Sequence, residues 1–105
     1  MISAVFTANG KTLTGFQISG HSGYAEEGQD IVCAAVSSAA LMAANTITEI
    51  QRLRADIAVD DGFLKLNLSS GDAQTASVTL EGLRLHLTAL AKEHPQFIHV
   101  TISEV

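Results

Sequence analysis

Residues 20–38 of the chain have the sequence GHSGYAEEGQDIVCAAVSS. The residues before position 30 are mostly polar and include glycine, as in a loop, whereas those from position 31 on are apolar and small, as in a helix. Asp30 stands at this change, and aspartate is a favoured N-cap residue, so we expect the helix to begin there. Cys33, the only cysteine of the chain, then falls in the first turn. The stretch therefore predicts a strand exit, a loop and a helix that carries the cysteine near its start.

The segment before this stretch is predicted to form a β-hairpin. Residues 2–7 alternate apolar and polar side chains, and residues 12–19 continue as a second strand after an Asn9-Gly10 turn. The apolar pattern of the second strand changes phase near Gly15, which indicates a β-bulge.

The segment after this stretch is predicted to form two helices, a second hairpin and a last strand. The first helix has no clear polar face in its first half, so we expect it to be buried nearly all round. Either a sheet covers one side and a second helix the other, or part of this surface meets a partner subunit. A second helix starts within residues 69–72 and carries leucines at helical spacing. The predicted ranges are 31 to about 51 for the first helix, 55–59 and 64–68 for the hairpin strands, up to about 92 for the second helix, and 97–103 for the last strand.

The order ββαββαβ predicts an α+β fold rather than regular βαβ winding. We expect a single-domain sandwich in which a mainly antiparallel sheet packs with the two helices. With 105 residues, 47% hydrophobic and 16% charged, the chain is long enough for one globular domain over residues 1–105 but not for two.

Composition excludes several classes of function. A net charge of −5 argues against nucleic acid as the direct ligand, because phosphate contacts need a basic patch. An acidic surface either attracts a basic peptide or serves only solubility. The N-terminal residues lack the pattern of a signal peptide, and the apolar segment 31–44 is shorter than a membrane span and interrupted by serines. We therefore expect no membrane partner and a reducing cytoplasm, which a single cysteine suits.

No pattern of a metal or cofactor site is present in the sequence. Neither the His-x-x-x-His nor the Cys-x-x-Cys spacing occurs. The glycines near position 20 fit neither the P-loop nor the dinucleotide fingerprint. We expect His86, His94 and His99 to be surface or boundary residues.

The chemistry of a lone cysteine near a histidine depends on ionisation of the thiol. A thiol attacks as its thiolate, and an imidazole or the positive end of a helix lowers the thiol pKa. If Asp30 caps the helix, the N–H groups of residues 31–33 are unpaired and are able to favour a thiolate or hold an oxyanion. His21 reaches Cys33 if the loop, which contains Gly23 and Gly28, folds back. The arrangement suits a Cys/His hydrolase.

Each of these residues also has a purely structural interpretation. A cysteine at the start of an apolar helix is commonly an inert core residue. His21 then is a solvated loop histidine, Asp30 a simple helix cap, and Ser37 a small residue that allows close packing. Under this alternative the chain is a non-enzymatic ribosome-associated or dimerising module with a structural or redox-sensing cysteine.

The complete stretch resembles the signature of the ribosomal-processing cysteine proteases (Prp). The resemblance rests on Gly20-His21, the spacer, and residues 28–37, GQDIVCAAVS. It extends over essentially the full chain, including HPQFI at 94–98. The family is expected to have a small apolar residue at the position of Ser22, so local loop packing differs there.

The resemblance implies a cytoplasmic cysteine endopeptidase that acts as a homodimer without a cofactor. Cys33 is then the nucleophile, and His21 is the general base that later protonates the leaving amine. The implied substrate is a large-subunit ribosomal protein precursor, whose N-terminal extension is removed by a cut after a Phe-containing hydrophobic segment.

The resemblance also assigns supporting positions. Asp30 orients the loop or the helix start, and Ser37 supports the surroundings of the cysteine. Gly20 is required because a side chain there obstructs the substrate backbone or the conformation of His21. We expect a flexible loop that closes over the peptide, with Ser22, Gly23, Tyr24 and Gly28 as its members.

Overall fold

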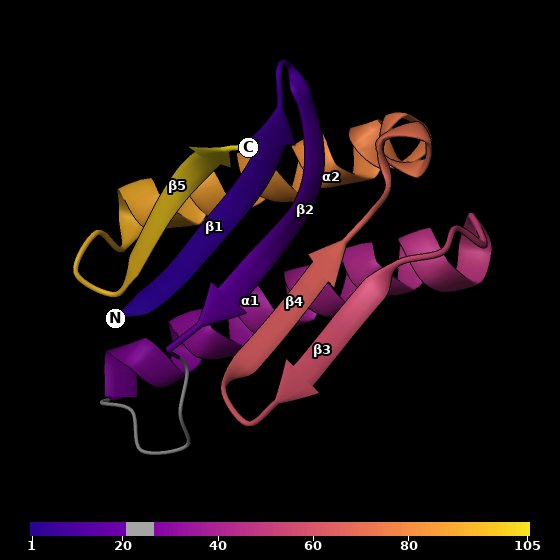
Figure 1. The fold of residues 1–105 in the computed structure, drawn as a ribbon. Helices are drawn as coiled ribbons and strands as arrows, with labels where there is room; N and C mark the ends of the chain where they lie inside the picture. The colour runs from indigo at the N-terminus through magenta and orange to yellow at the C-terminus, as the bar shows by residue number, and fades with distance from the viewer. Residues whose placement is uncertain (21–26) are drawn as a thin grey trace.

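The structure is a computed structural model that describes residues 1–20 and 27–105 (Figure 1). The order ββαββαβ is confirmed, and most boundaries lie within one or two residues of the predicted ones. The elements are β1 (Ile2–Asn9), β2 (Thr12–Ser19), α1 (Glu27–Asn45), the π-helical turn η1 (Thr46–Ile50), β3 (Asp56–Asp60), β4 (Phe63–Asn67), α2 (Ser70–Glu93) and β5 (Ile98–Glu104).

The five strands form one sheet in the order β3-β4-β2-β1-β5. All neighbouring pairs are antiparallel except β1 and β5, which run parallel. Both helices cover the same face of the sheet, with α2 behind β5, β1 and β2, and α1 behind the end of β2 and β4 (Figure 1). The single-domain α+β sandwich predicted from the sequence is therefore confirmed.

The core lies between this sheet face and the two helices. Phe6 and Phe16 face each other across β1 and β2 with ring centroids 6.2 Å apart. The buried residues of the helices repeat at helical spacing, as an amphipathic face requires. They are Val32, Val36, Ala40, Ala43, Ala44 and Ile47 of the first helical segment and Ala73, Ala76, Leu80, Leu83 and Leu87 of α2.

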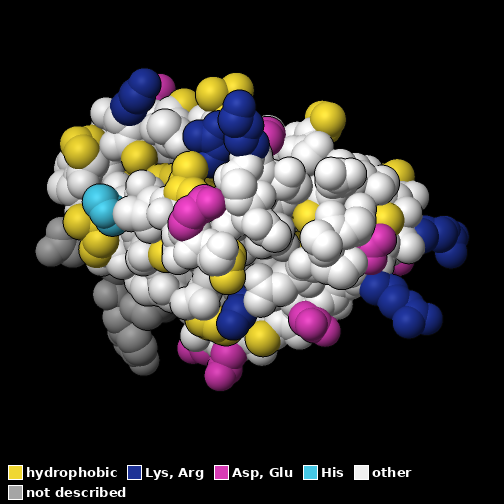
Figure 2. Space-filling view, turned by 45° about the horizontal axis from the view of Figure 1, so that its top comes forward, with side chains coloured by type: hydrophobic (Ala, Val, Ile, Leu, Met, Phe, Trp, Pro, Cys, Tyr) yellow, Lys and Arg dark blue, Asp and Glu magenta, His cyan; other side chains and the backbone are white. Residues whose placement is uncertain are grey.

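The other face of the sheet is open and polar. Its positions in β1 and β2 are mainly serine and threonine, and Thr14 donates a hydrogen bond to Thr7 Oγ1 at 3.1 Å across the two strands. In Figure 2 the Lys and Arg side chains lie apart from one another rather than gathered in one patch.

The first helix is less buried than predicted. Ile31, Leu41 and Met42 are 68%, 51% and 69% exposed, so only one stripe of the helix faces the core. By length and composition the segment Ile31–Ile50 is able to cross a membrane, and 33% of it is buried. The prediction from the sequence counted only the strongly apolar residues up to 44 as the segment, whereas the helix, which was predicted to continue to about residue 51, is apolar enough on average as far as Ile50. A core helix of a soluble protein passes the same test, and the buried stripe of this one packs on the sheet.

The bulge predicted near Gly15 is present in β2. Thr7 pairs with Gly15 and Ala8 pairs with Leu13, so Thr14 is the extra residue. On its other side β2 lies so close to β4 that a Cβ on Gly15 would overlap the carbonyl oxygen of Leu66. Gly15 is therefore needed for close approach of two backbones.

Candidate active site

The predicted catalytic histidine and most of the predicted loop lie outside the described residues. These are His21, Ser22, Gly23 and Tyr24. The pairing of His21 with Cys33 therefore stays a prediction, and the site is built from the elements on either side.

Gly20 directly precedes His21, the predicted catalytic histidine. Its φ of +94° is a left-handed conformation that favours glycine. Its N–H donates to the carbonyl oxygen of Gly62 at 3.2 Å, which ties the end of β2 to the turn between β3 and β4. A Cβ here would overlap the carbonyl oxygen of Met1. A side chain is thus excluded by the chain's own backbone, a reason that the sequence did not reveal.

The first helix begins earlier than predicted. It starts at Glu27, so Asp30 is its fourth residue and not its N-cap, and Gly28 belongs to the helix rather than to the loop. Glutamate and glutamine are good helix formers, and an acidic residue in the first turn interacts favourably with the helix dipole. These preferences outweigh the cost of one glycine and the capping preference of aspartate.

This earlier start changes the surroundings of Cys33. Only the first four N–H groups of a helix lack an intrahelical acceptor, and residues 31–33 come after the first four residues of α1. The N–H groups of residues 31–33 are used within the helix, so the prediction that they hold an oxyanion is wrong. Cys33 lies in the second turn, where the field of the helix terminus has weakened. Activation of its thiol then depends mainly on a neighbouring group.

Cys33 is partly exposed and packs against the edge of the core. Val32 and Val36 beside it are buried, which places the cysteine on the flank of α1 at the border of the sheet-facing stripe. Ser37 lies one turn further on the same flank and is also partly exposed. The cysteine is held by the core but is not sealed inside it, as a nucleophile for a large substrate requires.

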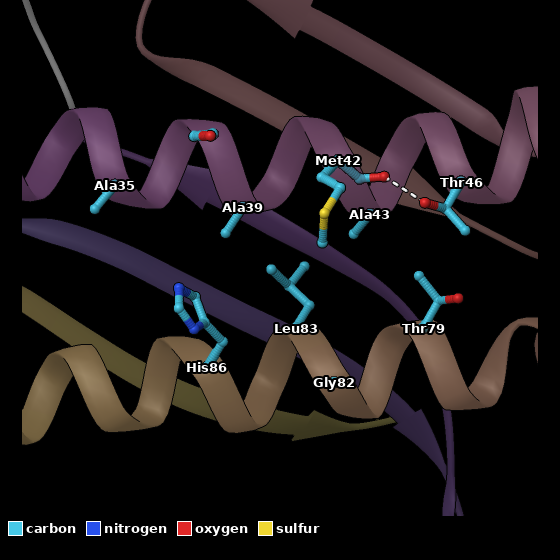
Figure 3. A pocket seen from close by; sticks show the side chains of 10 residues that line it. Ala35, Ala39, Met42, Ala43, Thr46, Thr79, Gly82, Leu83 and His86 are labelled. Carbon is cyan, nitrogen blue, oxygen red and sulfur yellow. Dashed lines mark hydrogen bonds between the residues drawn. The ribbon is translucent and has the colours of Figure 1, made fainter.

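Two pockets adjoin opposite flanks of α1. A groove of about 760 Å³ lies between α1 and α2, and Figure 3 shows Ala35, Ala39 and Met42 opposite Leu83 and His86 across it. A smaller pocket of about 160 Å³ lies between α1 and the β3–β4 hairpin and includes Ser37 in its lining. The smaller pocket is the one on the flank that carries Cys33.

The remaining histidines occupy the positions expected of surface residues. His86 is exposed on α2, and His99 is exposed on β5. His94 is the C-cap residue of α2, and its N–H donates to Leu90 O at 2.9 Å. Within residues 1–20 and 27–105, no group of three His, Cys, Asp or Glu residues could hold a metal ion.

Apart from Ser37, the residues lining the smaller pocket were not identified as site residues from the sequence. They come from three strands and a helix, and Val59 was recognised only as one residue of an alternating strand pattern. The sequence shows an apolar residue at this position, but its exposure follows from the strand order, which the sequence does not give.

Comparisons with known proteins identify a family to which the chain is similar over most of its length. The family model described as cysteine protease Prp matches residues 1–99. The ribosomal processing cysteine protease Prp of Bacillus subtilis is 28% identical over 97 residues, which are 87% of each chain.

Solved structures share the complete fold. SMU.848 from Streptococcus mutans has a TM-score of 0.90 at 30% identity and covers 100% of this chain and 96% of its own. The ribosomal processing protease Prp from S. aureus in complex with a substrate peptide has a TM-score of 0.89 at 25% identity, covering 98% of this chain and 100% of its own. The same S. aureus protease with a covalently linked product peptide has a TM-score of 0.85 at 26% identity, with the same coverage.

Proposed function

Because this chain belongs to the Prp family of cysteine proteases, we propose that it removes the N-terminal extension of a large-subunit ribosomal protein by cutting after a Phe-containing hydrophobic segment. Membership of the family makes the chain an enzyme and removes the alternative of a non-enzymatic module. The observation that carries the proposal is the match, over 98% of the chain, to a ribosomal processing protease that holds a substrate peptide.

We assign the chemistry to Cys33 and His21. His21 takes the proton of the Cys33 thiol, and the thiolate attacks the carbonyl carbon of the scissile peptide bond. The resulting tetrahedral intermediate collapses as the protonated imidazole gives its proton to the leaving amine, which leaves a thioester on Cys33. His21 then takes a proton from water, the hydroxide attacks the thioester, and the Cys33 thiol and the new carboxyl end are released.

Two features of the described residues support this assignment. Cys33 is partly exposed on α1. Gly20, the residue directly before His21, is hydrogen-bonded to the β3–β4 turn. The relative with a covalently linked product peptide is a protease of the same fold. Since the amides of residues 31–33 are used within the helix, donors to the oxyanion lie elsewhere. We place the reaction in the cytoplasm, whose reducing conditions keep the nucleophilic thiol reduced.

Incubation of the enzyme with the extended ribosomal protein under reducing conditions is expected to yield a single shortened product. Mass spectrometry of the product should locate the cut directly after the Phe-containing segment. A precursor in which the Phe residues are replaced by Asp is the control and should remain intact. An intact natural precursor, or cuts scattered along it, would contradict the proposed activity.

We further propose that the enzyme is a homodimer whose interface lies on the outer surface of the helices. Met42 of α1 and Val78 and Leu85 of α2 lie outside the buried stripes of their helices and are 69%, 84% and 72% exposed. Between the helices runs the groove of Figure 3, where Ala35, Ala39 and Gly82 leave room for side chains of a second copy. Soluble monomers rarely expose contiguous apolar patches larger than a few hundred Å².

Replacing Met42 with glutamate is expected to raise the dimer dissociation constant by about tenfold or more, because a charge would be buried in an apolar interface. Light scattering coupled to gel filtration across a dilution series measures the change. Ile102→Glu is the matched control, since Ile102 is also exposed, at 52%, but lies on β5. Equal masses for the wild type and both variants at all concentrations would rule out this interface.

A further inference from the structure

Strand β5 forms the edge of the sheet opposite to β3, and Figure 1 shows it at the margin of the sheet. Within residues 1–20 and 27–105, no strand pairs with its outer side. An unpaired edge offers backbone donors and acceptors to another chain, so proteins commonly protect it with lysine, proline or a bulge. The sequence of β5, IHVTISE, contains neither lysine nor proline, and its pairing with β1 is regular from Ile98 to Glu104. This edge is therefore open to a further strand.

Alternate residues of β5 direct their backbone groups away from the sheet. The carbonyl oxygen of Phe97 accepts a hydrogen bond from β1 at 2.8 Å, and the N–H of Val105 donates to β1 at 2.9 Å. Odd-numbered residues thus bond to β1, and the backbone groups of the residues between them face outwards. The outward N–H of Ile98 donates within the chain, to the carbonyl oxygen of the α2 C-cap residue at 3.2 Å. Val100 and Ile102 therefore present two N–H and two C=O groups to an added strand.

A groove of about 270 Å³ lies beside this edge, between β5 and the last turns of α2. Thr88 and Ala91 of α2 and Ile98 and Val100 of β5 contribute to its lining. Ile102, which is 52% exposed, lies two residues further along β5 and so points to the same side of the sheet as Val100. The groove is larger than the ~150 Å³ cavity that holds benzene. It has room for an apolar side chain of an added strand.

The two ends of the groove carry opposite charges. Lys92, in the last turn of α2, contributes to the lining, and none of the described residues that line it carries a carboxylate. The Glu93 carboxylate lies outside the lining, 4.0 Å from the imidazole of His94. Glu104 lies at the other end of β5, where its carboxylate accepts a hydrogen bond from the Gly10 N–H at 3.1 Å. An added strand is therefore favoured when its negative end lies at Lys92.

We propose that the edge of β5 and the adjoining groove bind an extended segment of a partner protein that ends in a free C-terminal carboxylate. The segment runs antiparallel to β5, so that its carboxylate lies at Lys92 and its backbone pairs with Val100 and Ile102. An apolar side chain near its end enters the groove. Several peptide-binding domains recognise their ligands by such strand addition. The C-terminus of a second copy is less suited, because its Val105 N–H is already bonded to its own β1.

This site lies away from the catalytic cysteine and does not depend on the proposed activity. Cys33 is on α1, which lies behind the end of β2 and β4, whereas β5 is at the far end of the sheet order (Figure 1). A partner bound at β5 thus leaves the flank of α1 that carries Cys33 uncovered. The site is suited to holding the enzyme on a partner while the catalytic side stays accessible.

Fluorescence anisotropy with the Cys33→Ala protein tests the charge at Lys92. The probe is a fluorescein-labelled octapeptide of alternating threonine and valine that ends in valine with a free carboxylate, and its C-terminal amide is the control. We expect the free acid to bind about 3- to 10-fold more tightly than the amide. In Lys92→Gln the two peptides should bind equally. Lys11→Gln, whose lysine lies in the β1–β2 turn, is the matched control and should keep the preference.

Amide hydrogen exchange followed by NMR locates the bound probe. Saturating free-acid peptide should slow the exchange of the Val100 and Ile102 N–H groups by about tenfold or more, because they gain acceptors. The Thr101 N–H faces β1 and should change less. Ile57 of β3 is the control at the other edge of the sheet, and its exchange should stay the same.

Methylated probes test the backbone pairing without changing the protein. Only one edge of an added strand bonds to β5, so methylation of the nitrogens of one alternate set of peptide residues should abolish binding. Methylation of the other set should preserve it. Equal effects of the two sets would show that the peptide does not bind as a strand.

Three further results would overturn the proposal. The first is equal affinity of the acid and the amide for the protein that retains Lys92. The second is slowed exchange at Ile57 rather than at Val100 and Ile102. The third is exchange at Val100 and Ile102 that slows with rising protein concentration in the absence of peptide, which would assign the edge to a second copy. None of these results alters the outcome of the precursor cleavage experiment, so the two proposals fail separately.

Discussion

Replacing Cys33 with alanine is expected to reduce precursor cleavage by about 10⁴-fold or more, because no covalent intermediate then forms on the enzyme. Loss of one member of a catalytic unit commonly has such an effect, since the remaining members do not act separately. Cys33 is only partly buried, so the variant should fold like the wild type. Initial rates from quantitative mass spectrometry, with circular dichroism as a check on folding, measure the effect.

Histidine variants distinguish a specific loss of the proposed Cys33–His21 dyad from a general disturbance of the fold. His21→Ala should reduce cleavage strongly, whereas His99→Ala should leave it unchanged, since His99 is exposed on the open sheet face. The rate of Cys33 alkylation across a pH series tests activation directly. We expect wild-type modification well below pH 8 and, in His21→Ala, a shift of its midpoint upwards towards ~8.5, the ordinary thiol value. A thiol that reacts only after unfolding would refute the assignment of Cys33 as nucleophile.

Replacing Gly15 with alanine is expected to destabilise the fold by roughly 3 kcal/mol or more, the range of severe core changes. The added Cβ would overlap the carbonyl oxygen of Leu66 in β4, and neither backbone is able to move without breaking pairs in the middle of the sheet. Phe16 follows directly and is 1% exposed, so displacement of β2 also opens the core. A loss of this size lowers the midpoint of thermal unfolding by roughly 10–25 °C.

Gly71→Ala is the control for this prediction. Gly71 has ordinary backbone angles and nothing within 4 Å of an added Cβ. The midpoint of thermal unfolding of the Gly71→Ala variant should therefore differ little from that of the wild type. Thermal unfolding followed by circular dichroism compares the two variants. Equal midpoints for both would show that the β2–β4 backbones have room to separate at low cost.

Signals within a few residues of one another predicted the elements correctly. Alternation identified the strands, and Asn9-Gly10 identified the first hairpin turn. Ser69 was part of the signal for the start of α2, where its hydroxyl accepts from the Asp72 N–H. These features involve neighbours in the chain, so local preferences decide them. The start of α1 was missed because a cap at Asp30 and a longer helix from Glu27 differ by only about 1 kcal/mol in local preference.

The sequence by itself determined the α+β class, the order of the elements and the family, with Cys33 as the candidate nucleophile. Only the tertiary structure decided that β3 lies at the sheet edge, that Gly20 adjoins Met1, and that α1 leaves Val59 uncovered. Several strand orders bury the same alternating faces equally well, so the pattern along the chain does not choose among them. Packing between residues far apart in sequence decides the strand order. The pocket beside Ser37 depends on that order, because its lining comes from three strands and α1.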